Sequence, residues 1–334
     1  MTKKSHTIVR NTGMELLKMG MATLCLLCLS CRNASTANGG GPMLTESNAV
    51  GGEQKTVRHD DDRKREPAAD VAPEPDVTQV ESDPLLLCTT PPSMPSQILR
   101  RIAYITSYNH DTRCPNWVAW HLTKEHLDGP HKRNGVPYYD DEGRAMGIGA
   151  VNDTIFHGGY FLDLEAEEPR QLLSDWAGER YNMTHGHLCP AGDNKWNRAA
   201  MNQTFLLTNI CPQAGKLNSG GWNSLENKCR SWAGRFGDIY IVSGPIYEGG
   251  RVRRTFGDSK VAVPDAFFKV VLCTNGKPKA AGFIYPNDDE SHRMTDMVCS
   301  VDSVEQVTGF DFFLSLPDEV ECEVEAKTVW KEWQ

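Results

Sequence analysis

Residues 181–235 contain the side chains of this chain that are best suited to chemistry. The segment begins with His185 and His187 on either side of Gly186, and a glycine there lets the backbone turn and exposes an imidazole. An imidazole with its ordinary pKa of about 6.5 is neutral near pH 7 and can take a proton from water. This pair is therefore a candidate for chemistry, with a surface histidine in a turn as the simpler alternative.

A second group of polar side chains follows on a predicted helix. Asn218 stands near its start, and Trp222, Glu226 and Arg230 follow at successive intervals of four residues, which places them on one face. Two strands and a helix that present histidine, asparagine, glutamate and arginine resemble a site for metal-assisted cleavage of a phosphodiester.

These residues need a scaffold, and the chain from about residue 98 onward has the pattern of a mixed α+β domain. Two helices are predicted, at 217–236 and 303–308. Because strands outnumber helices and do not alternate with them regularly, a doubly wound parallel sheet is disfavoured. The predicted strands, rich in β-branched and aromatic residues, are 98–108, 117–122, 204–210, 238–243, 266–273 and 280–285.

The wider pattern resembles the DNA/RNA non-specific endonuclease family, which includes the Serratia-type nuclease and endonuclease G. The chain has the family's Gly-His pair at 186–187, its Asn-Ile-x-Pro-Gln at 209–213 and its Leu-Asn-x-x-x-Trp at 217–222. The similarity extends over roughly residues 100–320. It implies an α+β fold with a central antiparallel sheet flanked by helices and a ββα-metal (His-Me finger) active site.

The resemblance also assigns roles to individual positions. It makes His187 the general base and Asn218 the protein ligand of Mg²⁺, with Mn²⁺ as a possible substitute. Glu226 would hold water around the ion, and Arg230 and Arg133 would bind phosphate and stabilise its charge in the transition state.

Simpler explanations exist for several of these positions. Asparagine near the start of a helix is a typical N-cap, which would account for Asn218. Glu226 is spaced to pair with Arg230 one helical turn later, and a basic loop such as that around Arg133 is usually solvated. Large aromatic residues such as Trp222 are expected in the core.

One position departs from the family pattern. Thr184-His185 stands where the family has Asp-Arg ahead of the Gly-His pair. The family's arginine lies near the substrate and its aspartate helps to hold the loop, so the change concerns rate and substrate preference. His185 could contact phosphate, form an H-x-H metal pair with His187, or simply be solvated.

Asp193 and Asn194, a few residues later, are expected to shape a turn.

The first residues have the features of an export signal. Basic residues precede the apolar run 19–30, which has the length of a signal core and is too short to span a membrane. Ser30 followed by Cys31 resembles a bacterial lipoprotein processing site. We therefore expect an exported protein, either a cell-envelope lipoprotein anchored to the membrane through Cys31 or an extracellular protein.

Three regions follow from these patterns. Residues 1–31 are the expected lipoprotein-type signal peptide, and residues 32–95, acidic and rich in proline, are the expected disordered tether. Residues 96–334 are the expected endonuclease domain.

Eight cysteines remain after the signal, and an even number in an exported chain indicates disulfides. Free buried thiols are the alternative for those near the site, Cys189, Cys211 and Cys229.

Composition limits the functions that fit. The 334 residues carry a net charge of −9, which argues against passive nucleic-acid binding through a broad basic face. We therefore expect a metal-dependent endonuclease that hydrolyses DNA and RNA with little sequence specificity and leaves 5′-phosphate ends. Two alternatives are a phosphodiesterase of the same fold with another substrate and a non-catalytic nucleic-acid-binding surface lipoprotein. The oligomeric state is left open.

Overall fold

The computed structural model describes residues 83–132, 147–148, 160–176 and 183–334, with only the backbone at 147–148. The expected signal peptide, most of the expected tether and Arg133 lie outside these residues. Among the residues described, no helix has both the length and the apolar composition needed to cross a membrane.

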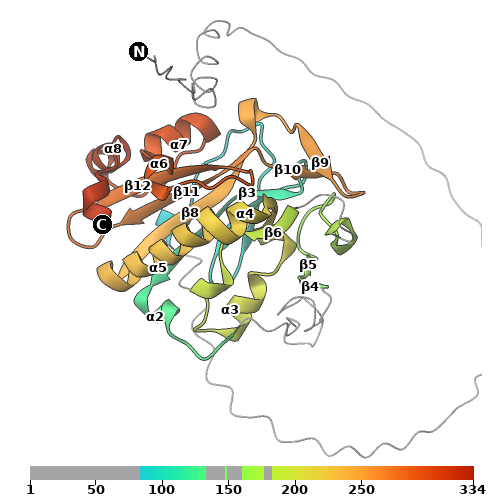
Figure 1. Cartoon of the computed structure of the whole chain (residues 1–334), viewed down its shortest axis with the longest axis horizontal. Helices are drawn as coiled ribbons and strands as arrows, with labels where there is room; N and C mark the ends of the chain where they lie inside the picture. The colour runs from blue at the N-terminus through green and yellow to red at the C-terminus, as the bar shows by residue number, and fades with distance from the viewer. Residues whose placement is uncertain (1–82, 133–146, 149–159, 177–182) are drawn as a thin grey trace, which may run out of the picture. The chain divides into compact units, whose positions relative to one another are not determined.

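A seven-stranded sheet forms the centre of the described structure, and every neighbouring pair in it is antiparallel. The predicted central antiparallel sheet is thus confirmed (Figure 1). In spatial order its strands are β1 (Gln97–Arg100), β2 (Ile105–Asn109), β3 (Cys114–Thr123), β8 (Asp238–Ile246), β11 (Ala266–Cys273), β12 (Lys279–Pro286) and β13 (Val298–Cys299).

Side chains of the sheet alternate between two hydrophobic cores, as the strand repeat of two requires. Phe267 of β11 belongs to the core shared with helix α5 (Asn223–Phe236). Its neighbour Phe268 belongs to the core shared with α7 (Val301–Thr308) and α8 (Asp318–Glu325). Because both faces of the sheet are covered, β11 is buried along nearly its whole length.

A two-stranded ribbon and a helix pack beside this sheet and form the finger. Strand β6 (Met183–His187) pairs antiparallel with β7 (Ile210–Ala214). The chain then enters α4 (Gly215–Leu217), passes through one π-helical turn (Asn218–Trp222) and continues as α5. The predicted helix at 217–236 is confirmed, and it begins two residues earlier than expected.

The predicted strand at 98–108 is interrupted, because its residues form a hairpin of β1 and β2. Residues 101–104 make the turn between them, where the Arg101 amide donates to the Tyr104 carbonyl at 2.8 Å. The Arg101 guanidinium is buried and forms ion pairs with Asp163 at 2.6 Å and Glu165 at 2.8 Å. These long-range partners fix the turn, and no local pattern shows them.

The predicted strand at 204–210 is wrong. This segment follows helix α3 (Arg198–Gln203), makes a 3₁₀ turn and becomes a strand only at Ile210. The Asn209 side chain accepts from the Cys189 amide at 2.9 Å and donates to the Thr204 carbonyl at 2.7 Å, so it satisfies backbone groups that a strand would pair. The apolar residues that resembled a strand are buried in a small cluster under this turn.

All eight cysteines of the described residues are free thiols, so the expected disulfides are not formed in this structure. Six of them are buried and occupy apolar positions, as free cysteine often does. Burial raises the pKa of Cys229 to about 12, which keeps this thiol protonated. The alternative of free buried thiols near the site therefore describes Cys189, Cys211 and Cys229.

Residues 83–95, which the sequence pattern assigns to the tether, pack against the domain. Leu86 is buried and Thr89 forms a bridge with Asp311. Folded structure therefore extends upstream of residue 96.

The remaining helices and strands are short: α2 (Lys124–Leu127), β4 (Gly147–Ile148), β5 (Leu162–Asp163), β9 (Arg254–Phe256), β10 (Val261–Val263) and α6 (Met294–Met297). Four 3₁₀ helices lie at Pro84–Leu86, Leu173–Trp176, Ala191–Asp193 and Leu207–Asn209, and two more at Glu248–Gly250 and Trp330–Trp333.

Candidate active site

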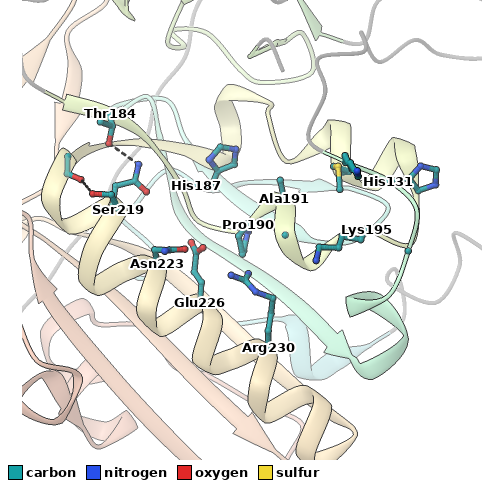
Figure 2. A pocket seen from close by; sticks show the side chains of 16 residues that line it. His131, Thr184, His187, Pro190, Ala191, Lys195, Ser219, Asn223, Glu226 and Arg230 are labelled. Atoms are coloured by element: carbon teal, nitrogen blue, oxygen red, sulfur yellow. Dashed lines mark hydrogen bonds between the residues drawn. The ribbon is translucent and has the colours of Figure 1, made fainter. Parts of the chain in front are cut away.

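A cleft of about 680 Å³ lies along the finger. Its lining includes His187, Asn218, Glu226 and Arg230, four of the six residues that the sequence pattern selects. In Figure 2, Glu226 and Arg230 extend from helix α5 toward the strand that carries His187. The structure therefore brings these four together, while Arg133 falls outside the described residues.

His187 is held at the end of β6 by contacts on two sides. Its carbonyl accepts from the indole N–H of Trp222 at 3.3 Å, and its ring meets Phe205 edge to face with centroids 5.0 Å apart. Gly186 is needed beside it for close packing, because a Cβ there would lie 2.6 Å from the Cβ of Gln213 on β7. The glycine thus lets two strands approach each other, and no turn is present at this position.

His185 occupies an aromatic stack. Its ring lies between Tyr160, 3.9 Å away and inclined by 12°, and Trp176, 3.8 Å away and inclined by 19°. It is not one of the residues that line the cleft. The structure therefore places His185 beside the site, in a contact that neither the metal-pair nor the solvated alternative anticipates.

The orientation of the Asn218 amide follows from a chain of hydrogen bonds. The Thr184 hydroxyl donates its one proton to the Gln213 carbonyl at 2.9 Å, so it can only accept from Asn218, whose amide nitrogen lies 2.9 Å away. With the nitrogen bound to Thr184, the amide oxygen is left for another partner. The N-cap explanation for Asn218 is wrong, since the helix begins at Gly215 and this side chain bonds to β6.

The π-helical turn that carries Asn218 packs tightly on the sheet. A Cβ at Gly221 would lie 2.9 Å from the ring of Tyr285 on β12, so only glycine allows this approach. A π turn widens the helix by one residue and is often found at functional sites. Here it presents Asn218 while Trp222 stays buried and bonded to the His187 carbonyl.

Arg230 is fixed by a buried carboxylate. Its guanidinium forms an ion pair with Asp193 at 2.7 Å and also donates to Asn227 at 2.9 Å. Burial lowers the pKa of Arg230, but the charge and hydrogen bond of Asp193, together with the nearby Glu226, raise it above its ordinary value. Asp193 also accepts from the Trp120 indole at 3.1 Å, so it connects α5 with β3. Turn formation, the role expected for Asp193, describes only part of what this residue does.

Lys269 is a charged residue near the site that sequence reasoning missed. It is only 1% exposed, and its ammonium lies 4.8 Å from the ring of Trp120 and 4.6 Å from that of Trp222. These are the two indoles that bond to Asp193 and to the His187 carbonyl. The available signal was a lysine within the apolar run of β11, at a position that alternation assigns to the α5 face.

The cleft is basic although the chain is acidic. Lys132, Lys195 and Arg230 line it, against the single carboxylate Glu226 among the described lining residues. Cationic side chains in a concave site attract and position a polyanion. Lys132 and Lys195 were not selected from the sequence. Lys132 belongs to the basic loop around Arg133, for which solvation was the simpler explanation, and Lys195 carries no spacing signal.

Comparison with known proteins agrees with this geometry. The model of the DNA/RNA non-specific endonuclease family matches residues 82–319. The chain belongs to this family. Among solved structures, a chain of the EndoG/EndoGI complex aligns with a TM-score of 0.53 at 24% identity, covering 67% of this chain and 89% of that one. At that identity the likeness shows the shared fold.

Several named nucleases are similar in sequence. The mitochondrial nuclease EXOG of Xenopus laevis is 32% identical over 76% of this chain and 66% of its own length. Nuclease C1 of Cunninghamella echinulata is 32% identical over 66% of this chain and 84% of its own. Human EXOG is 30% identical over 62% of this chain and 54% of its own. This chain therefore spans about half of the length of one relative and most of the length of another.

The donor set at the centre of the cleft fits a hard divalent cation. It offers an oriented amide oxygen from Asn218 and a carboxylate from Glu226. Such oxygen donors suit Mg²⁺ or Mn²⁺, which keep much of their water when few protein ligands are present. Cys189 and Cys229, the thiols nearest to this region in sequence, are buried and have raised pKa values, so they do not offer soft thiolate ligands.

Substitution of Asp193 tests the buried ion pair. Asp193→Asn keeps the shape and an acceptor for Trp120 but removes the charge opposite Arg230, so we expect it to lower the free energy of unfolding by about 1–3 kcal/mol. Urea denaturation measures this loss. Asp258→Asn, which removes the same charge at an exposed position, should leave stability within about 0.5 kcal/mol of the wild type. Equal stability of both variants would show that the pair contributes nothing.

Proposed function

We propose that this chain is a metal-dependent endonuclease that hydrolyses phosphodiester bonds of DNA and RNA with little sequence specificity. The observation that carries the proposal is the convergence of His187, Asn218, Glu226 and Arg230 in one cleft of a family member. The basic lining favours a polyanionic substrate over a small neutral one. These features also favour a catalyst over the alternative of a non-catalytic binding lipoprotein.

His187 acts as the general base in this proposal. Its ring takes a proton from a water molecule that attacks phosphorus in line with the 3′ oxygen. The bond from phosphorus to that oxygen breaks, the 3′ oxygen takes up a proton from a second water molecule, and the product carries a 5′-phosphate. Phe205 and the Trp222 hydrogen bond hold the histidine in place, which reduces the orientational entropy lost in the transition state.

The cationic side chains act on the phosphate. Arg230 is oriented by Asp193 before substrate arrives, so its guanidinium does not have to reorganise as negative charge develops. Lys132 and Lys195 extend the positive lining along the cleft and would bind neighbouring phosphates. None of these contacts depends on base identity, which is the physical basis for low sequence specificity. Arg133, outside the described residues, remains a second proposed phosphate ligand.

Asn218 would hold the divalent cation, Mg²⁺ or Mn²⁺, through its amide oxygen, with Glu226 nearby as a second oxygen donor. When bound, the ion supplies Lewis acidity at the phosphate. Thr184 keeps the Asn218 oxygen directed away from β6 without adding charge. This offers a reason why threonine can occupy the position of the family's aspartate.

Export is the location that the sequence favours, with Cys31 as the site of lipid attachment to the cell envelope. The EXOG relatives from Xenopus laevis and human are named mitochondrial, so export is proposed from this chain's own sequence. An anchored nuclease would act on nucleic acid that reaches the envelope. This part of the proposal depends on the first 31 residues alone.

Replacing the base tests the mechanism. His187→Ala should lower kcat for plasmid nicking and RNA cleavage by about 10²–10⁴-fold, the range typical of a general base. Far-UV circular dichroism and thermal unfolding establish that the variant folds. His110→Ala, which changes a partly exposed histidine in the turn after β2, serves as the matched control. Turnover of His187→Ala within threefold of the control would remove His187 from this role.

Replacing Thr184 tests the orientation of Asn218. Thr184→Val has the same shape but cannot accept from the amide, so Asn218 is free to turn and the affinity for Mn²⁺ should fall by about 10–100-fold. Thr184→Ser keeps the hydroxyl and should retain wild-type affinity. Calorimetric titration with Mn²⁺ measures both. If Thr184→Val binds the ion as tightly as Thr184→Ser, the hydrogen bond does not position the ligand.

Labelling tests the anchor. Cells given a clickable fatty acid should label the wild-type protein, and Cys31→Ala should remain unlabelled because it lacks the thiol that carries the lipid. Cys322→Ala, an exposed cysteine far along the chain, should label like the wild type. Equal labelling of the Cys31 variant would contradict lipid attachment at this residue.

A further inference from the structure

A group of carboxylates lies on helices α7 and α8, far from the cleft in sequence. Asp302 and Glu305 are three residues apart on α7, so both face the same side of that helix. Glu325 ends α8, and one oxygen from each of these three residues lies within 4.8 Å of the others. Figure 1 shows the two helices as neighbours, and they pack on the face of the sheet opposite α5.

Glu325 is buried without compensation. The residue is 5% exposed, and its Oε1 has no hydrogen-bond donor among the described residues. Within the same part of the chain, Lys, Arg and His form no ion pair with Asp302, Glu305 or Glu325. Burying a carboxylate is costly unless a cation or several donors replace its water.

Glu325 lies among other carboxylates, and these mark the path by which a cation would enter. Glu305 accepts from the Phe312 amide at 3.0 Å through one oxygen, which leaves the other oxygen for the cluster. Asp302 is exposed, so the group runs from solvent at Asp302 to the interior at Glu325.

We propose that Asp302, Glu305 and Glu325 bind a divalent cation of the Ca²⁺ class that ties α7 to the end of α8. Three carboxylates with no histidine or cysteine form a hard oxygen site, which disfavours zinc and copper. Ca²⁺ tolerates irregular geometry and six to eight oxygen ligands, whereas Mg²⁺ demands near-octahedral order. The ion would supply the positive charge that no side chain of the described residues provides to Glu325.

Thermal unfolding of the full-length protein tests this directly. After EDTA treatment and desalting, millimolar Ca²⁺ should raise the Tm of the wild type by about 5 °C, because a ligand that binds only the folded state stabilises it. Glu325→Gln should not respond to Ca²⁺. Glu319→Gln, an exposed residue of α8 with the same change in charge, should respond like the wild type.

Two further measurements separate this site from the cleft and from misfolding. The Tm rise should persist in Asn218→Ala, since that variant removes the ligand proposed for the active-site cation. Should Glu325→Gln fail to fold, Asp302→Asn at the exposed end carries the test and should weaken Ca²⁺ binding about tenfold by calorimetry. The proposal is overturned if the wild type shows no Ca²⁺-dependent rise, if Glu325→Gln rises equally, or if Asn218→Ala abolishes the effect.

Discussion

The Asp193 carboxylate is the group on which the arrangement of the site depends. It is buried, so it must keep its donors, and these come from two elements: Arg230 on α5 and Trp120 on β3. Satisfying one buried charge therefore fixes the helix and the central sheet relative to the loop that follows His187. The same ion pair orients Arg230 toward the cleft, which makes a structural requirement serve the proposed chemistry.

Lys269 adds a second cation to this arrangement. Its ammonium lies against the rings of Trp120 and Trp222, and it lowers the pKa of Asp193, partly offsetting the effect of burial. The two tryptophans shield the buried charges from water and donate hydrogen bonds at the same time. Cation, indoles and carboxylate thus form one buried group that contacts Arg230 and the His187 carbonyl. Removing any one of these side chains would leave a buried polar group without its partner.

The sequence predicted what depends on local pattern. The apolar runs of β8, β11 and β12 located the sheet, and the Leu217–Trp222 motif located the helix that presents Asn218. It missed what depends on contacts between distant segments, such as the side-chain bonds of Asn209 that prevent a strand at 204–210. The pairing of Thr184 with Asn218 across 34 residues was hidden for the same reason. The four clustered residues came from a motif, whereas the lysines and Asp193 became visible only in three dimensions.

The distribution of charge is consistent with the proposed action of an acidic protein on a polyanion. The chain carries a net charge of −9, while Lys132, Lys195 and Arg230 bring positive charge to the cleft. Attraction confined to one concave region favours productive encounters over binding elsewhere. Under the proposed function, weak attraction outside the cleft would also let cleaved products leave, which a uniformly basic surface would hinder.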